Sequence, residues 1–231
     1  MEVKTESAEW FLHTPRYGLA EAARYIPGLS RSTLRSWALG RTYPVRHGRE
    51  TFEPVIELPD PQDQKLSFIN LVEAHVLYGL RSTKELSIRD LRKAIQYAQD
   101  TYGITHLLAH EDLRATPGNL FLDRYGELVN LTKAGQLAMR TILQAYLKRL
   151  VYAPHGFSTR LYPIVPWAPE HQDYLIDPKV AYGKPIIKKH GVRVATIVDR
   201  YNGDEPVERL AQEYGLEQEE VRQAIAYARA A

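Results

Sequence analysis

A proline-rich segment places the strongest constraint on how this chain folds. Four prolines lie between Pro163 and Pro178, in the stretch PIVPWAPEHQDYLIDP. Proline has no backbone N–H to donate and fixes its own φ, so this segment cannot form a continuous helix or a central strand. The sequence therefore predicts a linker, placed at residues 166–176, between a long N-terminal part and a C-terminal domain of residues 177–231.

The composition is that of a globular protein. The chain has 231 residues, of which 44% are apolar and 25% are charged, which suits one large domain or several small ones. It contains no cysteine, which excludes disulfides, thiolate metal sites and cysteine nucleophiles. No apolar run approaches the roughly 20 residues of a membrane helix, and the first residues lack the apolar stretch of a signal peptide. We therefore expect a soluble, cytoplasmic protein with no membrane partner.

The charge is distributed unevenly. The formal net charge of +2 is too small, as an average, to indicate a nucleic-acid binder. Residues 16–49, however, contain seven arginines and a single acid, Glu21. From His171 to the end, nine basic residues stand against ten acids, and six of these acids lie between Glu205 and Glu220. A basic, DNA-binding surface is therefore expected only in the N-terminal part.

The basic region has the pattern of a helix-turn-helix unit. Residues 19–25 (LAEAARY) predict a short helix, which Pro27 and Gly28 end. Ser30 is a suitable N-cap for a second helix over residues 31–39. Two short helices joined by a turn that contains glycine are typical of a helix-turn-helix.

A hairpin is expected directly after this unit. Residues 42–58 read as two strands with His47 and Gly48 at the tip, which is where a winged helix carries its wing. Arginine binds phosphate or guanine, and serine and threonine bind phosphate or make flexible base contacts. The predicted DNA-binding residues combine the second helix with the hairpin and are Arg31, Ser32, Thr33, Arg35, Ser36, Arg41, Arg46 and Arg49.

In the middle of the chain, the sequence predicts elements that pack together as structural support. Residues 67–80 are apolar around much of a helix and indicate a buried scaffold helix, and Ser87 begins an amphipathic helix that reaches Tyr102. Residues 119–131 read as a hairpin turning at Tyr125-Gly126, and a helix over residues 133–150 follows. A second hairpin is expected to turn at residues 154–156. We assign residues 1–110 to the DNA-binding domain and residues 111–165 to a middle region with hairpins and a helix.

In the C-terminal domain, the sequence predicts a hairpin around His190-Gly191 and helices over residues 195–201, 206–214 and 217–229. The last two helices again resemble a helix-turn-helix. The final helix, however, begins with Glu217, Glu219 and Glu220, whose carboxylates would repel phosphate. We therefore expect this domain to bind protein. The predicted fold class is mainly α with small β-hairpins: a winged helix-turn-helix N-terminal domain, a helical middle region and a small trihelical C-terminal domain.

Catalytic and metal sites are not indicated. His106 and His110 lie four residues apart, a spacing that binds metal on a helix, but no third ligand is evident. The common motifs for dinucleotides, nucleotide phosphates and serine nucleophiles are missing. An enzyme such as a nuclease would need a cluster of carboxylates, and no pattern in the sequence indicates one. We therefore expect no enzyme activity, no metal and no cofactor.

These residues also resemble a known family. Leu19 to Trp37, followed by SFINLVEAHVL from Ser67 and SIRDLRKAI from Ser87, is similar to the MerR-like DNA-binding region of VapB-type antitoxins. Residues 185–228 resemble the domain-of-unknown-function antitoxin module that accompanies it. This module usually carries Gly-Thr-Arg and then a proline, where the present chain has Lys189-His190-Gly191 and Arg193.

The resemblance implies an antitoxin of a type II toxin-antitoxin pair. Such a protein binds its own operator DNA as a repressor and neutralises a PIN-domain ribonuclease, and we expect a homodimer. Basic side chains near the C-terminal hairpin are the candidates for toxin binding, namely Lys188, Lys189 and Arg193. The alternative is a free-standing MerR-like transcriptional regulator whose C-terminal part dimerises or senses a ligand.

Overall fold

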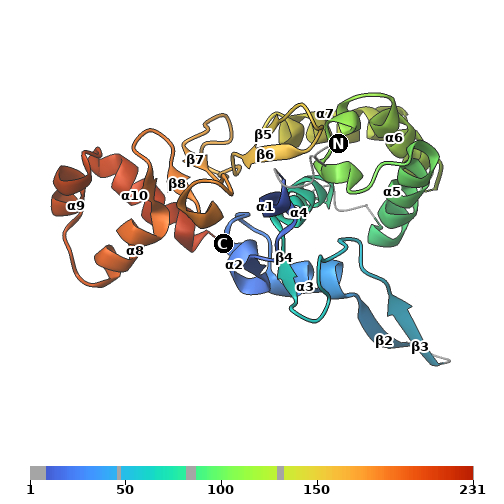
Figure 1. Cartoon of the computed structure of the whole chain (residues 1–231), viewed down its shortest axis with the longest axis horizontal. Helices are drawn as coiled ribbons and strands as arrows, with labels where there is room; N and C mark the ends of the chain where they lie inside the picture. Colours follow the sequence, from blue (N-terminus) through green and yellow to red (C-terminus); the bar gives the residue numbers. More distant parts are fainter. Residues whose placement is uncertain (1–8, 46–47, 82–86, 129–132, 231) are drawn as a thin grey trace, which may run out of the picture.

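The computed structural model describes residues 9–45, 48–81, 87–128 and 133–230, and it is mainly helical with small sheets (Figure 1). The elements before residue 115 are α1 Trp10–His13, β1 Tyr17–Gly18, α2 Leu19–Arg24, α3 Arg31–Leu39, β2 Arg41–Val45, β3 Gly48–Phe52, β4 Lys65–Leu66, α4 Phe68–Arg81, α5 Ile88–Tyr102 and the 3₁₀ turns η2 Leu107–Ala109 and η3 Glu111–Arg114. No helix in the described parts of the chain is long and apolar enough to cross a membrane.

The second half continues with more helices and short strands. These are α6 Thr116–Leu128, α7 Lys133–Leu147, β5 Leu150–Tyr152, β6 Ser158–Leu161, β7 Tyr174–Leu175, η4 Ala181–Gly183, β8 Ile186–Ile187, β9 Val192–Arg193, α8 Val194–Asn202, α9 Val207–Tyr214 and α10 Gln218–Arg229. All pairings are antiparallel: β1 with β4, β2 with β3, β5 with β6, and β7 with β8, which also pairs with β9.

Helix α4 is the centre of the larger hydrophobic core. Almost every residue of this helix is buried, and α1, α7, η2 and β4 pack against it. The core runs from Leu12 to Leu161 and also includes Ile176. The prediction of a buried scaffold helix over residues 67–80 is confirmed.

A second, smaller core holds the C-terminal module, defined here as β7 to α10. Helices α8, α9 and α10 pack together around residues such as Ile197, Leu210 and Val221. Tyr174 of β7 stacks on Tyr227 of α10, with ring centroids 4.3 Å apart. In Figure 1 this module lies at one end of the molecule, and the end of α10 lies beside α2.

Local capping signals predicted helix starts well. Ser30 caps α3 by accepting a hydrogen bond from the Thr33 N–H at 3.1 Å, and Ser87 caps α5 by accepting one from the Asp90 N–H at 3.4 Å. The hairpin β5–β6 and the three C-terminal helices also lie where the sequence predicts them. Their turn residues and apolar spacing are therefore sufficient local information.

The predicted hairpin over residues 119–131 is wrong. Residues up to Leu128 belong to helix α6, and residues 129–131 lie outside the described part of the chain. Gly126, the expected turn residue, lies inside this helix, where it allows close helix packing. A Cβ there would lie 2.6 Å from the Gln136 side chain of α7. The glycine therefore serves a tertiary contact, which a local pattern does not show.

The proline-rich segment contains a short strand. Tyr174 and Leu175 form β7 between Pro169 and Pro178, and pair with Ile187 and Ile186. The prolines themselves stay outside this strand, as their missing N–H requires. Val165 and Tyr174 also pack in the smaller core, so this core begins before residue 177.

His75 on α4 is a fully buried titratable group. Burial lowers its pKa from 6.5 to about 3, although a hydrogen bond to the Tyr146 backbone favours the charged form. Its ring packs against the Tyr146 ring, with centroids 4.8 Å apart. His75 is therefore neutral at physiological pH, and its protonation is coupled to unfolding.

We predict that His75 makes the protein sensitive to acid between about pH 6.5 and pH 3. A lowered pKa stabilises the folded state above the unfolded pKa, and this stability is lost as the pH falls toward the folded pKa. His75→Leu should remove a slope of roughly 1.4 kcal/mol per pH unit in this window. Urea unfolding at several pH values measures the free energy of unfolding of the wild type and of His75→Leu. If this free energy depends on pH in the same way for both proteins, the prediction is contradicted.

Candidate nucleic-acid interface

Helices α2 and α3 form a tightly packed pair. Ala22 and Ala23 of α2 are buried, as are Leu34 and Trp37 of α3. The small alanine side chains let the two helices approach closely. The buried side of α3 is thereby fixed against α2, and its other side is directed to solvent.

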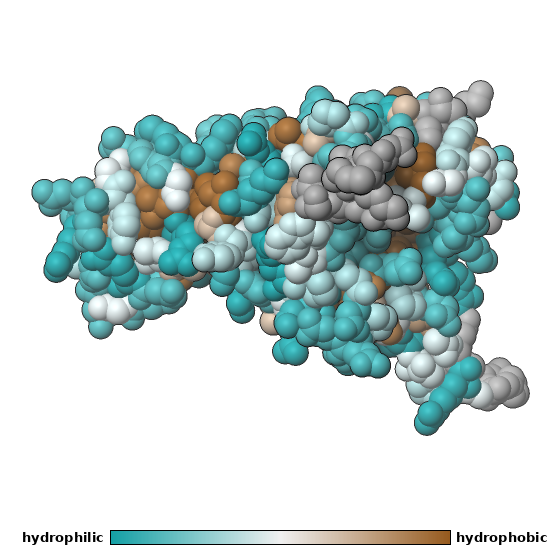
Figure 2. Space-filling model, viewed as in Figure 1, coloured by the Kyte–Doolittle hydropathy of each residue, from teal (hydrophilic) through white to brown (hydrophobic). Residues whose placement is uncertain are grey.

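The solvent side of α3 carries most of the predicted DNA-binding residues. Arg31, Ser32 and Arg35 are exposed, and Ser36 is partly exposed. Thr33 is also partly exposed, but its hydroxyl accepts a hydrogen bond from Ser30 at 2.8 Å within the cap. In Figure 2 the surface over α3 is mainly hydrophilic. The helix therefore presents two arginines and two serines to solvent.

The hairpin β2–β3 projects from the body next to α3 (Figure 1). The Trp37 carbonyl accepts hydrogen bonds from the N–H groups of Val55 at 2.8 Å and Ile56 at 3.0 Å, which tie the chain after the hairpin to α3. Arg41 and Arg49 are exposed on its two strands. Arg46, the third predicted hairpin arginine, lies outside the described residues, as does His47. The hairpin ends at Phe52, before the predicted Leu58.

Gly40 makes the connection between α3 and the hairpin possible. Its φ is +72°, and a Cβ at this position would lie 2.5 Å from the Phe52 carbonyl oxygen. Both observations require a residue without a side chain. The hairpin's position relative to α3 therefore depends on this glycine.

We predict that Gly40→Ala displaces the hairpin and destabilises the protein by more than about 1 kcal/mol. A matched control is Gly18→Ala, because φ is −63° there and a Cβ meets nothing within 4 Å. The control should cost about 0.5 kcal/mol or less. Thermal and urea unfolding would measure both variants, and equal stabilities would count against this role of Gly40.

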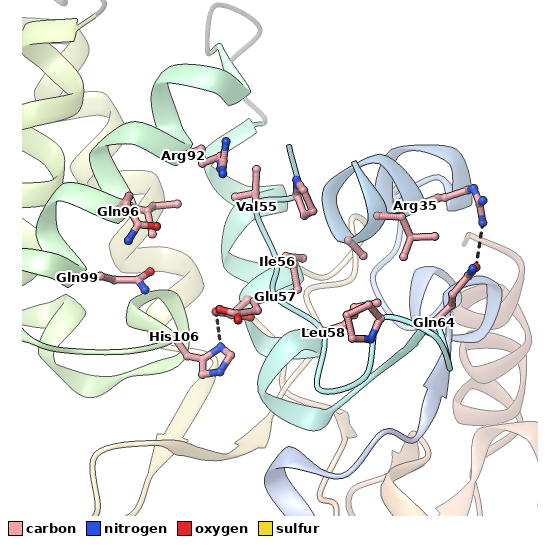
Figure 3. A pocket seen from close by; sticks show the side chains of 16 residues that line it. Arg35, Val55, Ile56, Glu57, Leu58, Gln64, Arg92, Gln96, Gln99 and His106 are labelled. Carbon is pink, nitrogen blue, oxygen red and sulfur yellow. Dashed lines mark hydrogen bonds and ion pairs between the residues drawn. The ribbon is translucent and has the colours of Figure 1, made fainter. Parts of the chain in front are cut away.

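A cleft of about 580 Å³ lies between α3 and α5 (Figure 3). Arg35 of α3 and Arg92 of α5 lie on its opposite sides, and the Arg35 guanidinium is 3.4 Å from the Gln64 side-chain oxygen. Gln96 and Gln99 of α5 also line the cleft. The predicted DNA-binding Arg35 therefore also borders a polar cavity.

A partly buried ion pair between Glu73 and His106 lines this cleft. Glu73 is 6% exposed, and its Oε1 lies 3.0 Å from His106 Nδ1. Burial opposes the charged form of His106, but the hydrogen bond and charge of Glu73, together with the charge of Glu57, outweigh it and raise the His106 pKa. No local pattern indicates this pair, because the two residues are 33 positions apart.

His106 and His110 each bond to a different partner within the chain. His106 has a φ of +52° and pairs with Glu73, and His110 caps η3 by accepting from the Asp112 N–H at 3.3 Å. The stretch is not a regular α-helix, so the four-residue spacing does not align the two rings. No group of three metal-ligating side chains occurs among the residues that the structure describes.

The C-terminal module is docked on the helix-turn-helix. The Tyr227 hydroxyl donates to the Tyr25 carbonyl at 3.0 Å, and the Gly28 N–H donates to the Ala230 carbonyl at 3.1 Å. Tyr25 and Gly28 both lie in the turn between α2 and α3. Arg16 donates to the Pro178 carbonyl at 2.8 Å, so this arginine of the basic region serves the domain contact instead of the exposed face.

The three residues predicted to bind toxin lie around the β8–β9 turn. Lys188, Lys189 and Arg193 are all exposed. The Lys188 ammonium lies 4.9 Å from the Tyr162 ring centroid, and the Lys189 ammonium lies 3.7 Å from Glu220. Two of these cations therefore already have partners within the chain.

The acidic start of α10 forms a capping box. Glu217 is the N-cap, and its N–H donates to the Glu220 side chain at 2.8 Å. This hydrogen bond lowers the Glu220 pKa, to which Lys189 and His190 also contribute. The start of this helix therefore carries carboxylates where a DNA-reading helix would carry donors.

The packed pair α2–α3 with its arginine-bearing face is a helix-turn-helix of the DNA-binding type. Comparison with known proteins agrees: the family described as "Putative DNA-binding HTH domain" matches residues 15–95. The family described as "Protein of unknown function (DUF433)" matches residues 175–228. Together the two matches cover the helix-turn-helix and the C-terminal module.

One curated protein and one solved structure match almost the whole chain. "Putative antitoxin VapB45" of Mycobacterium tuberculosis is 27% identical over 230 residues, which span 91% of this chain and 92% of that protein. The crystal structure of Rv2018 from Mycobacterium tuberculosis has a TM-score of 0.64 at 25% identity, covering 92% of this chain and 98% of that chain. The predicted resemblance to VapB-type antitoxins, with a helix-turn-helix region followed by a domain of unknown function, is confirmed.

Proposed function

We propose that the protein is the antitoxin of a type II toxin-antitoxin pair that represses its own operon and neutralises a PIN-domain ribonuclease in the cytoplasm. The similarity to an antitoxin along 91% of the chain supports this role. The observation that carries the DNA-binding half is the exposed face of α3, with Arg31 and Arg35 directed to solvent and the hairpin β2–β3 beside it.

In this proposal the N-terminal part is a winged helix-turn-helix. Helix α3 enters the major groove with Arg31, Ser32, Arg35 and Ser36, and the hairpin contacts the phosphate backbone with Arg41, Arg46 and Arg49. Thr33 contributes through the cap, because its hydroxyl is bonded to Ser30. A homodimer would place two such units on a palindromic operator.

We predict that the double variant Arg35→Ala and Arg49→Ala binds operator DNA more weakly and with a smaller salt dependence. Each lost phosphate contact should reduce the slope of log K against log salt by about 0.9, and a lost base contact should cost roughly 1–3 kcal/mol. Fluorescence anisotropy with DNA from upstream of the gene, at several salt concentrations, measures both quantities.

Arg222→Ala is the matched control. Arg222 is an arginine with a half-exposed side chain on α10, and it lies 3.7 Å from Glu219 in the acidic start of that helix. Its loss should leave affinity and slope unchanged, because the C-terminal module does not contact DNA in this proposal. Unchanged binding by the Arg35/Arg49 variant, or an equal loss in the control, would show that the DNA face has been misassigned.

The toxin half of the proposal rests on the similarity to an antitoxin. We predict that co-expression relieves the growth inhibition caused by the product of the adjacent gene. The triple variant Lys188→Glu, Lys189→Glu and Arg193→Glu should weaken binding to this product at least tenfold if cations at the β8–β9 turn face carboxylates of the ribonuclease. Growth assays and calorimetry with both purified proteins test this, and full relief by the triple variant would exclude these three residues.

The cleft beside Arg35 favours a second candidate function. A ligand bound between Arg35 and Arg92 would contact a DNA-binding side chain directly, as expected for a free-standing MerR-like regulator that senses a small molecule. The two candidates differ in the adjacent gene: only the antitoxin requires a growth-inhibiting product there.

A further inference from the structure

The most exposed aromatic side chain recorded in the structure lies on a strained turn. Tyr182 is 83% exposed, and Val180, two residues before it, is 42% exposed. Ala181 has a φ of +49° and Tyr182 a φ of +57°, and Gly183 follows at +73°. Residues with a Cβ disfavour this left-handed region, and two in succession are unusual.

Hydrogen bonds and close packing hold the backbone of this turn. The buried Asp177 accepts hydrogen bonds from the Lys179 N–H at 2.8 Å and from the Arg160 Nε at 3.0 Å. Gly183 packs against Tyr17, since a Cβ would lie 2.1 Å from the Tyr17 hydroxyl oxygen. Strained backbone persists where the surroundings enforce it, and such positions cluster at functional sites.

The charge around the turn is positive. Lys179 and Lys184 flank it, and both are exposed, although the Lys179 ammonium lies 4.7 Å from the Phe11 ring centroid and the Lys184 ammonium 3.6 Å from Glu21. The neighbouring carboxylates are already engaged: Asp177 pairs with Arg160, and Glu21 accepts from the Tyr25 hydroxyl at 2.7 Å and lies 3.6 Å from Lys184. The turn therefore presents an apolar tip between two cations, and a complementary surface is an apolar pocket with carboxylates at its rim.

We propose that residues 179–184, named here the tyrosine turn, are the anchor by which the protein binds the toxin, and that Tyr182 fills an apolar pocket with an acidic rim on that protein. This inference rests on the proposed antitoxin function and adds a binding surface separate from Lys188, Lys189 and Arg193. Contacts on either side already hold the backbone of this turn, so binding orders mainly the Tyr182 side chain, and tyrosine is enriched among the residues that dominate interface energies. Phosphate would gain little from the exposed Val180 and Tyr182 side chains, so a protein partner fits this tip better than DNA.

Tyr182→Gly separates binding from folding. Glycine accepts a φ of +57° without strain, so the melting temperature should equal or exceed that of the wild type. Calorimetry with the purified product of the adjacent gene should show affinity weakened at least about tenfold, the scale of an interface anchor. Tyr102→Ala is the control, because Tyr102 is 42% exposed on α5, outside the tyrosine turn. The double variant Lys179→Gln and Lys184→Gln should slow association and reduce its salt dependence.

The outcomes distinguish this inference from the proposed function. If the wild type binds the adjacent product and Tyr182→Gly binds within about twofold of it, the anchor is refuted and the antitoxin function stands. If the wild type neither binds this product nor relieves its toxicity, both fail. If Tyr182→Gly instead lowers operator affinity, or changes the mass measured by light scattering, the turn belongs to a DNA contact or a dimer interface and the inference is overturned.

Discussion

The side chain of Asn70, fully buried on α4, joins the elements that position the DNA-binding face. Its amide nitrogen donates to the Glu57 carbonyl at 2.8 Å and to the Glu73 side chain at 2.9 Å, and its oxygen accepts from the backbone and hydroxyl of Ser67 at 3.1 Å each. A buried amide is costly unless its hydrogen bonds are satisfied, so this network specifies one arrangement. It fixes the segment after the hairpin to α4, and the same segment donates to Trp37 at the end of α3. The face of α3 is therefore oriented by the large core.

How much of this could be read from the sequence depends on the range of the contacts involved. The solvent side of α3 follows from helical spacing, because Leu34 and Trp37 must face the core and Arg31 and Arg35 then face outward. The cap at Ser30 is equally local. By contrast, Arg16 bonds to Pro178 across 162 positions and Tyr227 bonds to Tyr25 across 202, and no local pattern contains these pairs. The basic count of residues 16–49 therefore overstated the charge of the DNA face.

The docking of the C-terminal module has a consequence for any repressor made from this chain. Helix α10 bonds to the turn between α2 and α3 through Tyr25 and Gly28, and Gly183 of the strained turn packs on Tyr17 just before α2. A partner seated on the C-terminal module therefore contacts a body that is continuous with the helix-turn-helix. A change in the position of α10 must either move that turn or break these hydrogen bonds. The helix-turn-helix and the C-terminal module therefore have separate exposed surfaces, but these hydrogen bonds join them.

The charges of the C-terminal module are largely used within the module itself. Arg200 donates to Glu205 and Glu213 and to the Tyr214 hydroxyl, which links α8 to α9. At the start of α10, Glu220 binds the Glu217 N–H and neighbours Lys189. Charges that already have partners gain less from a new one, because binding must first compensate for the interaction lost. An exposed aromatic side chain such as Tyr182 carries no charge and has no ion pair to lose. The strongest anchor of this module is thus expected where its surface is least polar.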